Sequence, residues 1–471
     1  MQPVGFCKLA VASLLLVLTG CASFSPDSGF DTVKSAVQER THAEPHWVRT
    51  HADEMNVRTS IKSLLGEPLT ADAAVRIALM NNRALQATYA EVGIAEADLV
   101  QAGRLRNPGF SYARLTRGDE LEIERAFIFD VLGLLTMPLR TQIERRRFDL
   151  TKIRVATEAT RVAADTRRAY YSAVAAQESV KYMEQVRETA EASAELARRM
   201  AAAGNFSKLD HAREQLFYAE STAQLARVKQ AAVAERERLT RLLGLSGDEV
   251  RYTLPARLPD LPKSPRDMAA VEHTALDGRL DVKAAMQHVE SVAWSLGLTR
   301  ATAFVSVLEL GYERNSETGR PHQTGYDIEL RLPLFDWGTA RVARAEFTYM
   351  QAVNRAADIS VRARSEVRDA YNAYRSAYDV ARHYRDEIVP LRKRISDENV
   401  LRYNGMLISV FELLADARQQ VASVNAYIEA VRDFWAAEAV LQLALVGASP
   451  GWMAPSGTLS MPAGSTGGGG H

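Results

Sequence analysis

Two stretches of this chain contain no glycine and almost no proline, and they constrain its fold more than any other feature. They run from Leu139 to Ala203 and from Thr339 to Asn404, with Pro390 as the single interruption. At a rise of 1.5 Å per residue, a helix of either length is about 100 Å long, several times an ordinary globular helix. A rod of that length cannot bury its own apolar side chains, so it needs partner helices along its course.

Each rod is followed by a predicted return helix, at about 208–244 and about 408–447. Apolar and alanine side chains recur along these helices at alternating spacings of three and four. The first seam is Leu209, Ala212, Leu216, Ala219, Ala223 and Ala226, and the second is Leu414, Ala417, Val421, Val424, Ile428, Val431 and Trp435. Such seams require antiparallel coiled-coil partners. A long cytoskeletal or adaptor coiled coil is the alternative, and the strands and the export signal weigh against it.

The rods belong to a unit that occurs twice. Four anchors recur in the same order at offsets of about 200 residues, which indicates an internal repeat. They are Leu79 with Leu276, Pro138 with Pro333, Gly204 with Gly405, and Gly244 with Gly447. We therefore predict repeats at 68–250 and 272–448, a linker at 251–271 whose prolines forbid a continuous helix, and a flexible glycine-rich tail at 449–471.

Each repeat also predicts two β-strands ahead of its rod, at about 108–131 and about 302–334. Between Tyr326 and Leu334, apolar residues alternate with polar or charged ones over the length of a strand that crosses a membrane in a β-barrel. The polar stretch 315–325 is predicted to be the loop of the second hairpin. Arg125 interrupts the apolar face of the first hairpin. Periodicity alone does not exclude a strand pair of a soluble sheet.

The N-terminal residues resemble a bacterial lipoprotein signal. Lys8 provides a positive region, residues 9–18 form an apolar segment too short to span a bilayer, and Cys21 follows directly. We predict a signal peptide at 1–20, acylation of Cys21, and an N-terminal extension at 21–67. Ala22 in place of aspartate favours sorting to the outer membrane. An ordinary signal peptide with a chance cysteine is the alternative, and no later stretch is apolar enough for a transmembrane helix.

Composition excludes several classes of function. Lysine plus arginine and aspartate plus glutamate both number 58, so no chain-wide charge suggests a nucleic-acid partner. Two cysteines exclude a disulfide scaffold, and no nucleotide, dinucleotide or metalloprotease motif occurs. We predict no enzyme activity and no cofactor. His42, His46, His51 and Met55 could chelate a soft or borderline metal, but Pro45 interrupts them, so we favour a solvated linker.

The number of strands requires an assembly. Four strands per chain cannot close a membrane barrel, since known barrels begin at about eight strands and open strand edges cannot face lipid. Three chains supply about twelve strands, which is enough to enclose a channel. The same three chains bring their long helices into a hollow cylinder beneath it.

With this plan, the chain resembles the TolC-type outer-membrane efflux proteins over roughly residues 68–448. The resemblance rests on the duplicated order of helix, hairpin and long helices, on LPLFDWG at Leu332 to Gly338, on the tips at Gly204 and Gly405, and on the LLGL and ALVG endings. It implies a mainly α fold with a β-barrel part, in which a homotrimer forms a twelve-stranded outer-membrane barrel continuous with an α-helical coiled-coil barrel. It also implies a periplasmic adaptor and an inner-membrane pump. The lipidated cysteine resembles the branch that serves pumps of the resistance-nodulation-division type.

The resemblance further implies where an adaptor docks and where the duct closes. The docking tips would be Gly204, Asn205, Ser207 and Asp210, together with Gly405, Met406 and Ser409. Some members close the periplasmic entrance with carboxylates six and nine residues after the second glycine. This chain has Phe411 and Leu414 there, with Glu412 and Asp416 as the nearest acidic residues. An apolar constriction that gates by dewetting and simple packing between helices both remain open.

The predicted function is a passive outer-membrane duct of a tripartite efflux system, gated at its helix tips and driven by the partner pump. The alternatives are a periplasmic coiled-coil scaffold lipoprotein without a pore, a diffusion porin, and a type I secretion duct. Metal ions, small toxic organic molecules and a secreted polypeptide remain open as cargo, and the lipoprotein signal favours the first two.

Overall fold

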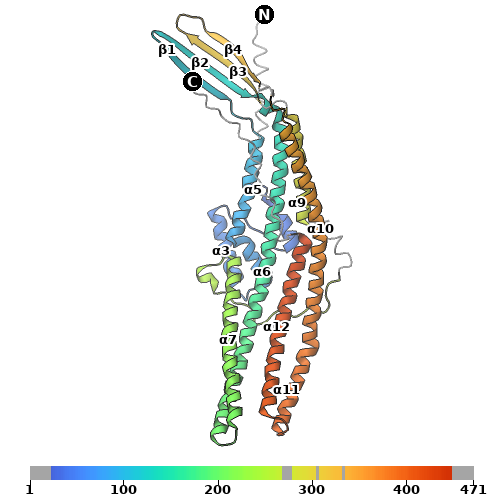
Figure 1. Ribbon diagram of the computed structural model, residues 1–471. Coiled ribbons are helices and arrows are strands. Elements are labelled where there is room, and N and C mark those ends of the chain that lie inside the picture. Colours follow the sequence, from blue (N-terminus) through green and yellow to red (C-terminus); the bar gives the residue numbers. More distant parts are fainter. Residues whose placement is uncertain (1–22, 268–277, 304–306, 331–334, 448–471) are drawn as a thin grey trace.

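The computed structural model describes residues 23–267, 278–303, 307–330 and 335–447. The molecule is a long rod of helices with a small sheet at one end (Figure 1). At the other end lie the two turns that join the paired long helices. Short helices pack against the side of the rod about halfway along it. None of the helices described combines the length and the hydropathy needed to cross a bilayer.

Both halves of the chain contain a helix, two strands, a long rod and a return helix in that order, and the described part of the first half begins with three further helices. The first half comprises α2 (Phe30–Thr41), α3 (His51–Leu65), α4 (Ala71–Asn81), α5 (Arg83–Ala102), β1 (Gly109–Arg117), β2 (Glu120–Asp130), α6 (Val131–Ala202), α7 (Lys208–Leu243) and the short η2 (Gly247–Val250). The second half comprises α9 (Leu280–Ala301), β3 (Leu308–Glu317), β4 (Gln323–Leu330), α10 (Thr339–His383), the π-helical η3 (Tyr384–Ile388), α11 (Val389–Asn404) and α12 (Val410–Val446).

The first rod is longer than the sequence indicates. Helix α6 begins at Val131, not at residue 139, and it passes through Pro138. The Asp130 carboxylate caps its start by accepting a hydrogen bond from the backbone N–H of Gly133 at 2.6 Å. Because Asp130 also ends strand β2, the chain passes from strand to helix without a loop. This cap satisfies one of the unpaired N–H groups in the first turn, and the helix then continues through Pro138, which cannot donate a backbone hydrogen bond.

The second rod contains a π-helical turn where the sequence has its single proline. Helix α10 ends at His383, η3 follows, and α11 begins one residue before Pro390. Proline lacks an N–H group, so a helix that continues through it loses a backbone hydrogen bond. The wider π turn accommodates that loss while the rod continues in roughly the same direction.

The second hairpin differs from its predicted extent. Strand β3 begins at Leu308 instead of 302, because α9 continues to Ala301. The predicted loop at 315–325 is shorter, since β3 continues to Glu317 and β4 begins at Gln323. Gly319 takes the left-handed conformation in the remaining turn. Residues 331–334, at the end of the predicted strand, lie outside the described part of the chain.

The strands form one antiparallel sheet in the order β1, β2, β3, β4. The central pairing joins the two halves of the chain, with Phe127 of β2 opposite Tyr312 of β3. Thr318 strengthens this junction: its backbone N–H donates to the carbonyl of Leu121 at 3.0 Å, and its hydroxyl accepts from the N–H of Leu121 at 2.9 Å. The predicted fold class, mainly α with four strands per chain, is confirmed.

The N-terminal extension is folded onto the rod. Val33, Val37, Val57 and Ile61 of α2 and α3 are each at most 5% exposed and belong to the main hydrophobic core. The solvated linker favoured for this part of the sequence is therefore wrong. Apolar side chains at helical spacing make one face of α2 and of α3 pack inward.

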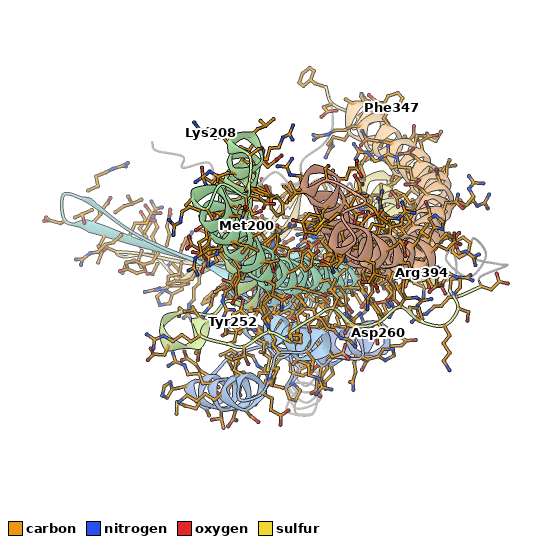
Figure 2. All side chains as sticks on the ribbon, turned by 90° about the horizontal axis from the view of Figure 1, so that it is seen from below. Met200, Lys208, Tyr252, Asp260, Phe347 and Arg394 are labelled. Carbon is orange, nitrogen blue, oxygen red and sulfur yellow. The ribbon has the colours of Figure 1, made fainter. Side chains whose placement is uncertain are left out.

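The linker between the repeats is a strap across the rod, formed by residues 251–267. Tyr252, Leu254, Leu258 and Leu261 of the strap are buried. Its backbone is bound to three long helices: the Leu258 N–H donates to Glu178 of α6, the Pro262 carbonyl accepts from Tyr378 of α10, and the Pro259 carbonyl accepts from Trp435 of α12. Figure 2 labels Tyr252 and Asp260 along this segment. The strap thus holds the helix pairs together partway along the rod.

In both repeats, a side-chain hydrogen bond connects the start of the helix before the hairpin with the end of the return helix. Asn82, at the start of α5, donates its side-chain amide to a carbonyl in the last turn of α7 at 2.9 Å, and Arg279, at the start of α9, donates to one in the last turn of α12 at 2.8 Å. Both return helices end on a left-handed glycine, Gly244 and Gly447. Arg279 is 1% exposed and is neutralised by Asp281 at 2.6 Å. Both repeats therefore join these two helices by a side-chain hydrogen bond at the same place, from an uncharged amide in the first repeat and from a charged guanidinium in the second.

Candidate channel wall, helix tips and gate

One face of the sheet is apolar and aromatic in the half that lies next to the rod. Phe110 lies opposite Phe127 with ring centroids 4.9 Å apart, and Tyr312 lies opposite Tyr326 at 5.6 Å. Alternation and register place further apolar side chains on this face: Tyr112, Leu121, Ile123, Phe129, Leu308, Leu310, Ile328 and Leu330. Most of them are exposed in the single chain. A face of this kind requires an apolar environment.

The opposite face of the same sheet is acidic. Its carboxylates are Glu120, Glu122, Glu124, Asp130, Glu309, Glu313, Glu317, Asp327 and Glu329. Asp130, Glu309 and Glu329 lie opposite one another on β2, β3 and β4, and so form one row across the sheet near the rod. Like charges directly opposite each other destabilise a sheet unless water or counter-ions surround them. Arg106 and Arg320 supply counter-ions to Asp130 and Glu317. A face with this many carboxylates still favours water, while the other face requires an apolar environment.

The first helix tip is polar. Gly204 has φ 78°, and the N–H of Asn205 donates to a carbonyl in the last turn of α6 at 2.9 Å. Ser207 caps α7 by accepting from the N–H of Asp210 at 3.0 Å, and its hydroxyl donates to the Asp210 carboxylate at 2.6 Å. Arg213 pairs with the same carboxylate at 3.3 Å. The predicted tip residues of the first half thus lie in one compact turn.

The second helix tip is apolar. Met406 and Leu407 are 93% and 77% exposed. Met406 takes the left-handed conformation, with φ 60°, whereas Gly405 has φ −80°. The glycine therefore does not provide the left-handed residue of this turn, as Gly204 does in the first tip. Ser409 caps α12 by accepting from the N–H of Glu412 at 3.3 Å. Leu407 lies within the tip predicted from the sequence but was not singled out as a docking residue, although two apolar residues directly after a tip glycine signal an exposed contact.

The candidate gate residues are spread over different surfaces of α12. Leu414 is 8% exposed and forms a small hydrophobic cluster with Ala190 of α6 and Phe217 of α7, which favours packing between helices over an open apolar constriction. Asp416 is 9% exposed, and its Oδ2 atom has no hydrogen-bond partner among the residues described. Glu412 is exposed. The side chain of Phe411 lies outside what the structure describes.

Arg418 adds a polar contact beside this cluster. Its guanidinium pairs with Glu220 of α7 at 3.1 Å and lies over the ring of Phe217 at 5.4 Å. The two helix pairs, α6 with α7 and α11 with α12, lie next to each other when seen from the tip end, with Met200 and Lys208 on the first pair and Arg394 on the second (Figure 2). Sequence reasoning missed Arg418, because its partners come from the other repeat.

Known proteins resemble this chain in part of its sequence and over most of its fold. No family model matches the chain. The cobalt-zinc-cadmium resistance protein CzcC of Cupriavidus metallidurans is 24% identical over 281 residues, which cover 57% of this chain and 64% of that protein. The match therefore spans less than two thirds of its length.

Solved structures show a more extensive likeness. A membrane protein from Pseudomonas aeruginosa matches with a TM-score of 0.69 at 20% identity, over 80% of this chain and 93% of that one. The CmeC outer membrane channel of Campylobacter jejuni matches with a TM-score of 0.67 at 16% identity, over 85% and 89%. The open state of the MtrE outer membrane channel of Neisseria gonorrhoeae matches with a TM-score of 0.61 at 18% identity, over 80% and 88%. The chain has the outer-membrane channel fold. The resemblance to TolC-type proteins is thereby confirmed at the level of the fold.

Within this channel fold, the predicted seam of α7 has an unexpected position. All six of its residues are exposed in the single chain: Leu209, Ala212, Leu216, Ala219, Ala223 and Ala226. The buried face of α7 is instead made by Glu214, Phe217, Ser221 and Leu225. The seam of α12 packs within the chain, with Leu414, Ile428 and Val431 buried. The channel fold therefore leaves one coiled-coil face of α7 without a partner in the described chain.

The histidines of the N-terminal extension do not form a metal centre in this channel fold. Among the described residues, no three or more histidine, cysteine, aspartate or glutamate side chains are grouped so that they could hold a metal ion. His42 and His46 line a shallow surface pocket together with Glu44 and Arg76, whereas His51 lies beside Glu54 at 3.7 Å. Glu44 is already paired with Lys34.

Two carboxylates of α6 have shifted pKa values for opposite reasons. Burial raises the pKa of Glu178, partly offset by the hydrogen bond that it accepts from the Leu258 N–H of the strap. Near the first tip, hydrogen bonds from Arg198 and Arg199 lower the pKa of Glu195 to about 2. Glu195 therefore stays charged at any physiological pH, while Glu178 is a titratable contact between rod and strap.

Proposed function

We propose that this chain is the outer-membrane channel component of a tripartite efflux system. Three copies form a duct: their sheets combine into a twelve-stranded barrel in the outer membrane, and their rods form an α-helical barrel in the periplasm. The duct performs no chemistry and is driven by an inner-membrane pump. The observation that carries the proposal is the two-faced sheet, apolar on one side and acidic on the other, at the end of a rod with the outer-membrane channel fold.

The homotrimer is supported by two unpartnered features. Strands β1 and β4 are the edges of a four-stranded sheet, and edges cannot face lipid unless further strands pair with them. Three copies pair every edge and leave the acidic face lining a water-filled lumen. The exposed seam of α7 supports the same assembly lower down, because a neighbouring copy can cover it.

The periplasmic partners are supported by the tips. The first tip, with Gly204, Asn205, Ser207 and Asp210, is polar, whereas Met406 and Leu407 of the second are an exposed apolar pair. An exposed apolar pair at the end of a polar rod fits a protein partner that covers it. We assign these tips to the periplasmic adaptor, with a pump of the resistance-nodulation-division type beyond it. Cys21, outside the described residues, is the proposed site of the lipid anchor.

Metal cations are the proposed cargo. The acidic face offers carboxylates along the whole sheet, and an acidic lumen raises the local concentration of cations. The relative CzcC carries cobalt, zinc and cadmium resistance in its name, which agrees with this class. A duct for small organic molecules and a type I secretion duct are the competing assignments.

Conductance in planar bilayers tests the proposal directly. We expect the purified full-length protein to insert and to form channels that are mostly closed until the helix tips are loosened. A scaffold lipoprotein would give no channels, and a diffusion porin would conduct steadily without any change at the tips; either result would refute the proposal. Zn²⁺ efflux from cells that supply the adaptor and pump then tests the cargo, with a deletion of this chain as the reference.

A further inference from the structure

Three arginines stand on the apolar face of the sheet. Arg114 of β1, Arg125 of β2 and Arg314 of β3 alternate with the residues of the acidic face, so their side chains share the face of Phe110 and Phe127. Arg114 and Arg314 are exposed and Arg125 is partly buried. None of the three forms an ion pair with any other residue that the structure describes.

Their spacing brings like charges together. The register of β2 and β3 pairs Ile123 with Ser316 and Ala126 with Glu313, which places Arg125 directly opposite Arg314. Arg114 lies opposite Ile123 and is therefore the diagonal neighbour of Arg125. Directly opposed residues have Cβ atoms about 5 Å apart and diagonal ones about 7–8 Å. Such a cluster is self-repulsive unless an anion lies between the guanidinium groups.

The cluster lies at a defined height on the sheet. Arg125 is five residues from the rod end of β2 at Asp130, or about 17 Å along the strand. Tyr112 lies directly opposite Arg125, Tyr312 and Tyr326 lie two residues nearer the rod, and the hairpin turns lie on the far side. Tyrosines mark the level where hydrocarbon meets headgroups in a membrane barrel. The arginines thus stand at the level of these tyrosines or just beyond it, where Ile123 and Leu121 are the apolar side chains of β2 that extend farther toward the turn.

This position excludes the lumen as the source of the anion. The acidic face must point into water, so the arginines point outward, toward lipid, if the chain forms the barrel proposed above. Arginine near the membrane interface costs only about 0–1 kcal/mol, so the position is tolerated. The guanidinium group of arginine binds phosphate through two parallel hydrogen bonds. The uncharged ester and amide groups of a lipid bind it more weakly, because they carry no negative charge. Thr324, opposite Arg314, adds a hydroxyl beside the cluster.

From these observations, and resting on the proposed outer-membrane barrel, we propose that Arg114, Arg125 and Arg314 bind the phosphorylated headgroup of an outer-leaflet lipid. One phosphate between Arg125 and Arg314 relieves their repulsion, and a second phosphate on the same headgroup reaches Arg114. Three guanidinium groups carry more positive charge than one phosphate neutralises, so a bisphosphorylated glycolipid matches the cluster better than a headgroup with a single phosphate. In the trimer, three such sites surround the barrel.

Binding by the purified full-length protein in non-ionic detergent tests this inference. The probe is lipid A, a bisphosphorylated glycolipid, compared with its dephosphorylated form and with inorganic phosphate. We expect tight binding of lipid A, much weaker binding of the dephosphorylated form, and competition by inorganic phosphate only at far higher concentration. Equal affinity for inorganic phosphate, or equal binding of the dephosphorylated lipid, would overturn the assignment to a phosphorylated lipid.

Variants locate the site. The triple variant R114Q/R125Q/R314Q should weaken lipid A binding on the order of 100-fold, taking about 1 kcal/mol for each arginine near the surface. Triple replacement by lysine keeps the charge but not the bidentate geometry, so an intermediate loss is expected. R117Q is the matched control, because Arg117 lies on the opposite face of β1. An equal loss in R117Q, or none in the triple variant, refutes the proposal.

Conductance separates this inference from the proposed function. The triple glutamine variant should still form channels with the wild-type conductance, since its changes face lipid and not the lumen. Channels without selective lipid A binding overturn only the lipid site. A wild-type protein that forms no channels overturns the proposed function itself, whatever it binds.

Discussion

Leu414 of α12 packs against Phe217 of α7, and Arg418, one turn further along α12, lies over the same ring while it pairs with Glu220. These residues come from different repeats, so their contacts tie the two helix pairs together below the strap. Loosening them is the smallest change that would let the pairs separate at the tips.

Leu414→Ala should raise the conductance of the channel in the absence of an adaptor. The substitution removes the apolar side chain that joins the helix pairs, and large-to-small changes at buried positions cost about 2–5 kcal/mol. The measurement is the open probability of single channels in planar bilayers. Leu401→Ala is the control, since Leu401 is 67% exposed near the same tip. Unchanged conductance in Leu414→Ala would show that this cluster does not hold the entrance closed.

Leu407→Asp should abolish binding of the adaptor while leaving the channel intact. A charge at the exposed apolar tip prevents a partner from covering it without leaving that charge buried and unpaired. Co-purification with the adaptor is the measurement, and single-channel conductance reports whether the duct still forms. Asn404→Asp places the same charge beside the tip on an already polar position and should bind the adaptor as wild type does. Retained binding in Leu407→Asp would remove the second tip from the docking surface.

The long helices and the strands were predictable because their signals are local. The absence of glycine and proline over each rod indicates a helix whatever surrounds it, and alternation indicates a strand. The start of α6 at Val131 was missed, because Asp130 caps a helix that continues through Pro138, whereas a rule based on proline alone places the boundary too late.

What the sequence could not show depends on contacts between distant parts of the chain. The pairing of β2 with β3 joins the two repeats and decides which residues share a face with Arg125. The heptad pattern of α7 is present in the sequence, yet Leu209 and Leu216 are exposed in the single chain. Periodicity shows that a helix needs a partner but not whether the same chain or another copy supplies it. The helices of the N-terminal extension were missed for a similar reason, since Val37 and Ile61 become core residues only against the rod.

Glu309→Gln with Glu329→Gln should reduce the preference of the channel for cations. These residues belong to the acidic row near the rod, and three copies would place a ring of them around the lumen. The reversal potential in a salt gradient is the measurement, and it should move toward that of a non-selective pore. Asp119→Asn, in the turn of the first hairpin, is the control for loss of a carboxylate outside the strands. An unchanged reversal potential would mean that this row does not line the conducting path.

Glu178→Gln should change how stability depends on pH, because burial raises the pKa of Glu178 in the folded protein. Below the ordinary glutamate pKa both states are protonated, and the contribution of Glu178 to stability is fully present. As the pH rises through the raised pKa, the unfolded state ionises first, so this contribution is lost. Glutamine still accepts the hydrogen bond from the Leu258 N–H but cannot ionise. Wild type should therefore lose stability relative to Glu178→Gln between mildly acidic and neutral pH, measured as the difference in urea midpoint.

Glu188→Gln, an exposed position on the same helix, reports the effect of losing one glutamate away from the strap. A difference between wild type and Glu178→Gln that stays constant with pH would show that the contact of α6 with the strap is not sensitive to this charge.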